Sequence, residues 1–133
     1  MTSPAVQDLG QVALAVRDVA AAKRFYVEVL GLRPLFDAGP KLAFLGVGAV
    51  RLMLTEPQGA GEAGRNSVLY YRVAALAEYY RRVVAAGAGP EREPRLAARM
   101  PDHELWLAFI RDPEGNLVGL MEERREYTQA RSP

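Results

Sequence analysis

The sequence predicts an α+β fold made of two consecutive βαβββ modules, and an internal repeat is the main observation behind this prediction. Residues 9–32 and residues 67–88 both have the pattern of a strand followed by an amphipathic helix that ends at a glycine. Val73 aligns with Val16, which gives an offset of 57 residues (73 − 16). A repeat of this kind indicates one supersecondary unit used twice. Because a half of about 60 residues is marginally stable alone, we expect a single domain over residues 1–133.

The first module is predicted from its alternation, its helix stripe and its turn residues. Residues 9–16 predict a strand, and the side chains expected to face the helix are Val12, Leu14 and Val16. Asp18 is placed to cap the next helix. The apolar positions of that helix follow i, i+3, i+4, i+7, i+8, and they are Ala22, Phe25, Tyr26, Val29 and Leu30. Gly31 fits the left-handed position that ends a helix. Three strands are expected to follow, at residues 33–37, 41–47 and 49–54.

The second module repeats this order. Residues 67–73 predict a strand, and the next helix has the same stripe, formed by Leu76, Tyr79, Tyr80, Val83 and Val84. Ala75 stands where the first module has its capping aspartate, so the start of this helix is weaker. Pro94 predicts that residues 91–98 form an edge strand. The last strands are expected at residues 104–111 and 117–122, joined by the turn DPEGN.

The expected boundaries follow from these elements: module one covers residues 8–55, a linker 56–66, module two 67–123 and a charged tail 124–133. One helix covers one face of each small sheet, as is typical of an α+β fold. We expect the two remaining faces to enclose a cleft. The side chains predicted to face it are Gln11, Ala13, Leu52, Leu54, Val68, Tyr70, Leu117, Gly119 and Met121.

Composition narrows the class of protein. With 17 basic and 16 acidic residues the net charge is +1, so no nucleic-acid partner is predicted. The chain has no cysteine, which excludes disulfides and thiolate chemistry. No apolar run approaches the ~20 residues that span a bilayer, so no membrane association is predicted. The first ten residues lack the pattern of a signal peptide, and we expect a cytoplasmic protein.

Four stretches resemble the vicinal oxygen chelate superfamily, the group of glyoxalases, bleomycin-resistance proteins and extradiol dioxygenases. They are residues 11–18 (QVALAVRD), Phe25-Tyr26, residues 30–32 (LGL) and residues 112–116 (DPEGN). The resemblance covers essentially the whole chain and implies a paired-module, barrel-like cleft and a homodimer. It implies no single activity, because the group includes lyases, isomerases, epimerases, dioxygenases and metal-free proteins that sequester drugs.

The resemblance also implies where a metal would bind. In the metal-dependent members, the first strand of each module supplies His or Gln and the last strand supplies Glu. Gln11 is a permitted ligand, but the other three positions carry Leu52, Val68 and Gly119. A divalent ion needs several converging oxygen or nitrogen donors. No cofactor is therefore expected, with a divalent Zn, Ni, Fe or Mn ion as the alternative.

His103 is the only histidine, and it lies beside Glu104 in PDHELW. These two residues are candidates for an acid, a base or metal ligands. Adjacent strand residues point to opposite faces, so they converge only if the chain bends there. The alternative is a structural or solvated histidine.

The candidate ligand-binding residues are Gln11, Tyr70, Arg72 and Trp106. Gln11 is either a hydrogen-bonding group in the cleft or an amide satisfied by backbone or water. Tyr70 and Arg72 share a strand face, and Arg72 receives an anionic group or is simply solvated. Trp106 either forms an aromatic wall or belongs to the core.

Three functions are consistent with these residues. The first is binding of a small, largely apolar molecule, by a metal-independent enzyme or by a binding protein. The second is a metal-dependent lyase, isomerase or dioxygenase with a relocated site formed by Gln11, His103 and Glu104. The third is sequestration of a drug by a dimer.

Overall fold

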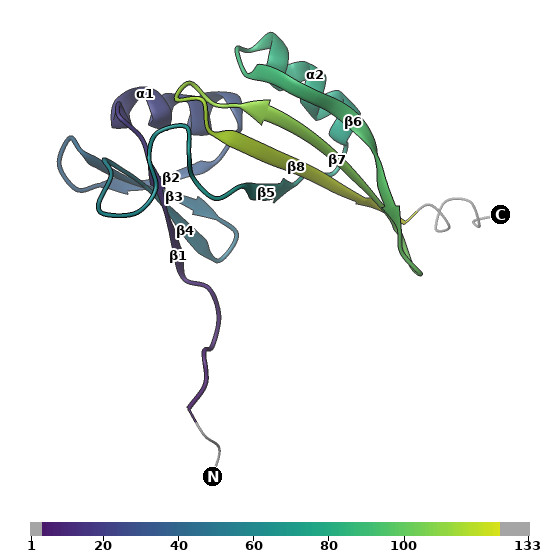
Figure 1. The fold of residues 1–133 in the computed structure, drawn as a ribbon, viewed down its shortest axis with the longest axis horizontal. Helices are drawn as coiled ribbons and strands as arrows, with labels where there is room; N and C mark the ends of the chain where they lie inside the picture. The colour runs from purple at the N-terminus through teal and green to yellow at the C-terminus, as the bar shows by residue number, and fades with distance from the viewer. Residues whose placement is uncertain (1–3, 126–133) are drawn as a thin grey trace.

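The computed structural model describes residues 4–125, and its elements follow the order βαβββ twice (Figure 1). Module one contains β1 (Gln11–Ala15), α1 (Val19–Arg24), η1 (Phe25–Val29), β2 (Arg33–Asp37), β3 (Leu42–Val47) and β4 (Val50–Thr55). Module two contains β5 (Leu69–Arg72), α2 (Leu76–Ala85), β6 (Gly89–Arg99), β7 (Glu104–Arg111) and β8 (Leu117–Arg124). The predicted tail begins inside β8, and from residue 126 it lies outside the described residues.

The two modules have the same sheet topology. The strand orders are β1-β4-β3-β2 and β5-β8-β7-β6, and only the first pair in each sheet is parallel. The backbone N–H of Val16 donates to Thr55, and the N–H of Val73 donates to Met121, both at 2.8 Å. The repeat offset is therefore 57 residues for the first strands (73 − 16) and 66 for the last strands (121 − 55). The predicted α+β fold of two βαβββ modules is confirmed.

The first helix starts at a side-chain cap and ends in a wider turn. Asp18 accepts a hydrogen bond from the backbone N–H of Ala21 at 3.0 Å. From Phe25 the helix becomes a π-helix, in which the N–H of Leu30 donates to Phe25 at 3.1 Å. Gly31 then has a φ of 90°, as a left-handed terminator requires. The helix and its apolar stripe are as predicted, whereas the π-helical turn was not predicted.

The residue that precedes the second helix cannot cap it with a side chain. Ala75 provides no side-chain hydrogen bond, but the Glu122 carboxylate accepts from the backbone N–H of Leu76 at 3.0 Å. Glu122 lies on β8, so a neighbouring strand supplies the acceptor that the local sequence lacks. The buried side chains of α2 are Leu76, Tyr80 and Val83.

A buried polar joint connects the modules. The Asp112 carboxylate accepts from the Tyr26 hydroxyl at 2.7 Å and from the Asn116 side chain at 3.0 Å. Asn116 accepts from the Asn66 amide at 2.8 Å, and Asn66 exchanges two 3.0 Å hydrogen bonds with the backbone of Ala15. The joint therefore links η1, the end of β1, the linker and the β7–β8 turn.

Both helices lie along the same side of the molecule in Figure 1, each over its own sheet. The opposite faces carry exposed aromatic side chains, with Phe36 52% exposed and Tyr70 49% exposed. We call these the open faces of the two sheets. The predicted edge strand is confirmed as β6, whose pairing with β7 is interrupted by register shifts. Within residues 4–125, no helix is long and apolar enough to cross a membrane.

Candidate functional site

The register of β1 with β4 determines which side chains share the first open face. Gln11 is paired with Arg51, and Ala13 is paired with Met53. The prediction that Leu52 and Leu54 face the cleft is therefore wrong. They are 1% and 0% exposed, because their side chains pack beneath α1 in the core.

Gln11 lies on the open face, as predicted, and Arg51 fixes its orientation. The Nε of Arg51 donates to Oε1 of Gln11 at 3.0 Å. The Gln11 Nε2 makes a long contact, 3.8 Å, to the sulfur of Met53. The guanidinium carbon of Arg51 also lies 5.9 Å from the centre of the Phe44 ring. Gln11 thus belongs to a row of side chains that crosses three strands.

Aromatic rings continue this row onto β2. Phe36 stacks on Phe44 with ring centres 4.6 Å apart and an interplanar angle of 21°. Phe36 is 52% exposed, so the outer side of the stack is open to a further planar group.

The second open face is built around Tyr70. Its ring lies on Gly119, since a Cβ at that glycine would be 2.6 Å from the ring. Tyr70 also meets Phe109 edge to face at 5.7 Å. Arg72 lies on the same strand face and forms a 3.5 Å ion pair with Glu123. Tyr70 and Arg72 are therefore brought together, as the strand alternation predicted.

An open pocket of about 770 Å³ adjoins this second face. It lies between the β3–β4 turn of module one and strands β5 and β8 of module two. Tyr70, Arg72 and Met121 contribute to its wall. Both modules therefore line one volume beside Tyr70.

His103 and Glu104 do not converge. The Nδ1 of His103 is 2.8 Å from Asp102, while Glu104 accepts from Trp106 at 3.0 Å and pairs with Arg99 at 2.8 Å. The hydrogen bonds from His103 and then Arg125 hold the pKa of Asp102 below its ordinary value. The end of the β6–β7 hairpin, which carries His103, lies at the right of Figure 1, whereas β1 lies at the left. The relocated metal site of Gln11, His103 and Glu104 is therefore not assembled within the chain.

Trp106 lies on the helix side of its sheet. In the register of β7 with β8 it is paired with Glu122, and it packs against the core. The guanidinium carbon of Arg124 lies 4.0 Å from the centre of its ring. Trp106 therefore does not share a face with Tyr70, in contrast to the grouping predicted from the sequence.

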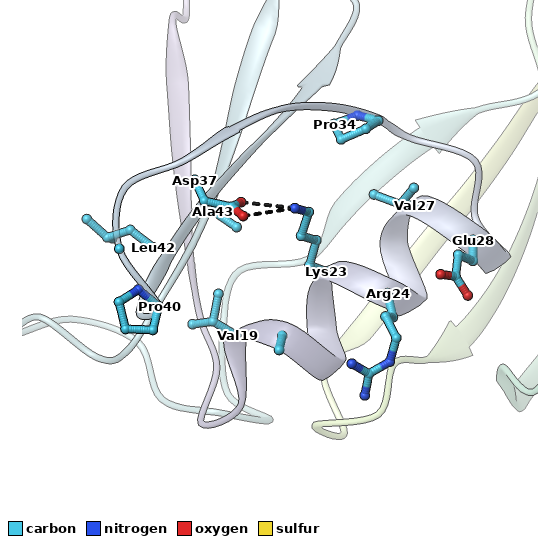
Figure 2. A pocket seen from close by; sticks show the side chains of 12 residues that line it. Val19, Lys23, Arg24, Val27, Glu28, Pro34, Asp37, Pro40, Leu42 and Ala43 are labelled. Carbon is cyan, nitrogen blue, oxygen red and sulfur yellow. Dashed lines mark hydrogen bonds and ion pairs between the residues drawn. The ribbon is translucent and has the colours of Figure 1, made fainter.

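A second pocket, of about 460 Å³, lies between α1 and the β2–β3 hairpin (Figure 2). Lys23 extends from the helix across it and binds both carboxylate oxygens of Asp37, at 3.1 and 3.0 Å. This pocket is on the helix side of the sheet, away from Gln11. This pocket was not predicted, because its residues come from a helix and a hairpin that show no shared motif.

Comparison with known proteins identifies the family. The family model described as Glyoxalase/Bleomycin resistance protein/Dioxygenase superfamily matches residues 8–120. The chain belongs to this superfamily. No curated protein sequence matches it significantly.

Several solved structures have a similar fold. A glyoxalase-related enzyme from Fulvimarina pelagi is 23% identical with a TM-score of 0.71, covering 88% of each chain. Lactoylglutathione lyase from Agrobacterium tumefaciens is 25% identical with a TM-score of 0.67, covering 88% of this chain and 94% of that one. TnmS3, an antibiotic-binding protein from Streptomyces sp. CB03234, is 22% identical with a TM-score of 0.71, covering 91% and 99%.

The metal positions of the superfamily can now be assigned from the observed repeat. Gly119 corresponds to Met53 (119 − 66), so Met53 replaces Leu52 as the last-strand position of module one. The four positions then carry Gln11, Met53, Val68 and Gly119. One amide and one soft thioether do not suit a hard or borderline divalent ion. No group of three His, Asp or Glu residues within the described part of the chain is placed to hold a metal. These residues do not fit the metal site of the metal-dependent members.

Proposed function

We propose that this superfamily member binds a small, largely apolar and planar molecule in a cleft formed by the open faces of its sheets. The observation that carries the proposal is the pair of aromatic clusters, Phe36 on Phe44 and Tyr70 on Phe109, each of which presents one half-exposed ring. Exposed rings on otherwise ordered strands provide stacking area at a low cost in conformational entropy. Gln11 and Arg72 supply polar contacts beside them.

The proposed active form is a homodimer. Phe36 and Tyr70 are both about half exposed in the single chain, 52% and 49%. A second copy that sets module two over module one of its partner would cover both aromatic clusters and close a cleft between them. This closure would exclude water from the ligand, which strengthens its polar contacts.

In the first form of this proposal, the protein binds its ligand without a metal ion and is either a metal-independent enzyme or a non-catalytic binding protein. Sequestration of a drug is the second form, and the antibiotic-binding neighbour is a relative by fold alone. A lyase, isomerase or dioxygenase that uses Zn, Ni, Fe or Mn at a relocated site is disfavoured, because His103, Glu104 and Gln11 have separate partners.

The test is a thermal-shift screen of planar aromatic compounds against the full chain, with EDTA and then with each metal. A ligand that binds only the native state raises the melting temperature. We expect stabilisation by at least one planar compound in EDTA, and its loss in Tyr70→Ala. Stabilisation only in the presence of a divalent metal would contradict the proposal. Turnover of that compound would then separate an enzyme from a binding protein.

A further inference from the structure

We propose that the open face of the first sheet binds the acidic group of an aromatic carboxylate. Arg51 and Arg33 would be its cationic contacts, and the ring pair of Phe36 and Phe44 its stacking surface. This inference rests on the proposed function and specifies the chemical class of the ligand. It follows from the charges, the donors and the rings of a face on which Gln11 was the only ligand-binding candidate predicted from the sequence.

The positive charge of this face is not compensated by acidic side chains. Register places on it the residues Arg33, Phe36, Phe44, Gly46, Arg51, Met53, Gln11 and Ala13. None of these residues is acidic, and within residues 4–125 neither Arg33 nor Arg51 forms an ion pair. Asp37, the acidic residue of β2, instead binds Lys23 on the helix side.

The polar groups that this face presents outward are hydrogen-bond donors. The Gln11 carbonyl oxygen is already occupied by the Nε of Arg51 at 3.0 Å. This contact leaves the Gln11 amide nitrogen and the terminal nitrogens of Arg51 to donate hydrogen bonds outward. A carboxylate accepts such bonds at two oxygens, and guanidinium groups match that geometry.

Arg33 is held on the same face by close packing against a glycine. Its guanidinium lies over Gly46, where an added Cβ would be 2.5 Å from Nη2. Gly46 is paired with Arg51 across β3 and β4 and with Arg33 across β2 and β3. The glycine thus lies between the two arginines and leaves room for the guanidinium of Arg33 above the sheet.

Dimerisation alone would not neutralise these cations. The open face of the second sheet carries Arg72, and its neighbours in the register include Arg92 and Arg95. The carboxylate of Glu123 is already paired with Arg72 and with Arg125, and that of Glu91 is paired with Arg111. Bringing the two open faces together therefore joins positive to positive. An anionic ligand with a planar body supplies both the missing charge and a partner for the exposed Phe36 ring.

Isothermal titration with 2-naphthoate and its neutral isostere 2-naphthamide tests the inference on the full chain. We expect naphthoate to bind at least about tenfold more tightly than the amide. Arg51→Gln should reduce the affinity for naphthoate about tenfold and leave that for the amide unchanged. Arg33→Gln should have the same effect, and Arg51→Lys should restore part of the affinity.

Arg81→Gln is the matched control, because it removes one positive charge from an exposed position of α2. Each variant is compared for melting temperature and oligomeric state, so that a misfolded protein is not mistaken for lost binding. Equal affinity for the two probes would overturn the anion inference and leave the proposed function standing. Binding of neither probe would also overturn the inference, whereas the proposed function is decided by the wider screen in EDTA.

Discussion

The two modules have the same backbone topology, but at one pair of corresponding positions on their open faces the small and the large side chain have exchanged strands. In module one, Ala13 of β1 is paired with Met53 of β4. In module two, Tyr70 of β5 is paired with Gly119 of β8. Each pair joins a small residue to a large one, but the large residue lies on the last strand in one module and on the first strand in the other. The repeat therefore conserves occupied volume, and not residue type, above this part of the sheet.

The starts of the two helices also have the same structure with different residues. Asp18 caps α1 from the preceding residue, whereas α2 receives its acceptor from Glu122 of β8. The same backbone requirement is met by a local residue in one module and by a distant strand in the other. Divergence of the two modules has left the fold intact and changed the chemistry of the open faces.

The largest predicted effect is at the joint that makes the two modules one unit. Asp112→Ala removes a buried carboxylate that accepts hydrogen bonds from Tyr26, Asn116 and the backbone of Glu114. We expect a loss of about 3 kcal/mol in the free energy of unfolding, because several buried donors lose their acceptor. Urea unfolding at pH 7 measures this loss. Asp37→Ala, at an exposed ion pair, should cost less than about 1 kcal/mol. Equal costs for the two variants would refute the buried joint.

The conserved side-chain volume above the two sheets is tested by substitutions that make module two resemble module one. Gly119→Met places a side chain where a Cβ alone would be 2.6 Å from the Tyr70 ring, so we expect a loss of about 1–3 kcal/mol. Adding Tyr70→Ala recreates the arrangement of Ala13 and Met53 and should recover most of that stability.

A double-mutant cycle measured by chemical unfolding isolates the coupling between the two positions. We expect a coupling free energy of at least about 1 kcal/mol. Additive effects of Gly119→Met and Tyr70→Ala would show that the two residues do not share a volume, which would break the comparison.

A smaller effect is expected at the distant cap of α2. Glu122→Ala removes the acceptor for the N–H of Leu76 and should cost about 1 kcal/mol, as loss of a helix cap usually does. Ala75→Asp places a capping side chain where module one has Asp18 and should restore that loss in the same background. Thermal unfolding of the single and double variants measures the rescue. A Glu122→Ala variant as stable as the parent would exclude a capping role.

The smallest effect at neutral pH concerns Tyr71, whose hydroxyl is buried and has no hydrogen-bond partner within residues 4–125. Burial, together with the nearby Asp112 carboxylate, raises the pKa of Tyr71 above the ordinary 10.0. Because the pKa of Tyr71 is higher in the folded than in the unfolded state, its protonated form stabilises the fold. This contribution is fully present below pH 10.0 and is lost as the pH rises toward the folded-state pKa.

Tyr71→Phe should therefore be within about 1 kcal/mol of the parent at pH 7, and it should lose less stability above pH ~10. Melting temperatures at pH 7 and above pH ~10 check both statements. Tyr70→Phe, at an exposed tyrosine, is the matched control. An identical alkaline loss in the parent and in Tyr71→Phe would show that this hydroxyl does not contribute.

Patterns with a strong period predicted the fold. The stripes in residues 19–30 and 76–84, and the glycines that follow them, were sufficient to place both helices. Strand β4 was harder, because Val50–Thr55 is apolar on both faces. Among these residues, only the charge of Arg51 indicates which face is exposed. Because Leu52 is adjacent to Arg51 on the strand, it points to the opposite face, which is the core.

The site was predicted less completely, because it depends on contacts between residues far apart in the sequence. Gln11 and Tyr70 were placed correctly by strand alternation, whereas the role of Arg51 requires the register of β1 with β4. A tryptophan is equally compatible with a core and with a cleft, so the residue type of Trp106 does not decide between them. Its pairing with Glu122 places it on the helix side. The contact of Tyr70 with Gly119 depends on a side-chain rotamer that no local pattern encodes.

The central claim, that the open faces bind a planar molecule without a metal ion, is tested most directly by equilibrium dialysis of the planar compound that stabilises the chain most in the thermal-shift screen. The protein is first stripped with EDTA and then supplied in turn with Zn, Ni, Fe or Mn. The account predicts binding in EDTA, with an affinity that changes less than about twofold on adding any metal. Binding that appears only when one of these metals is present would contradict it.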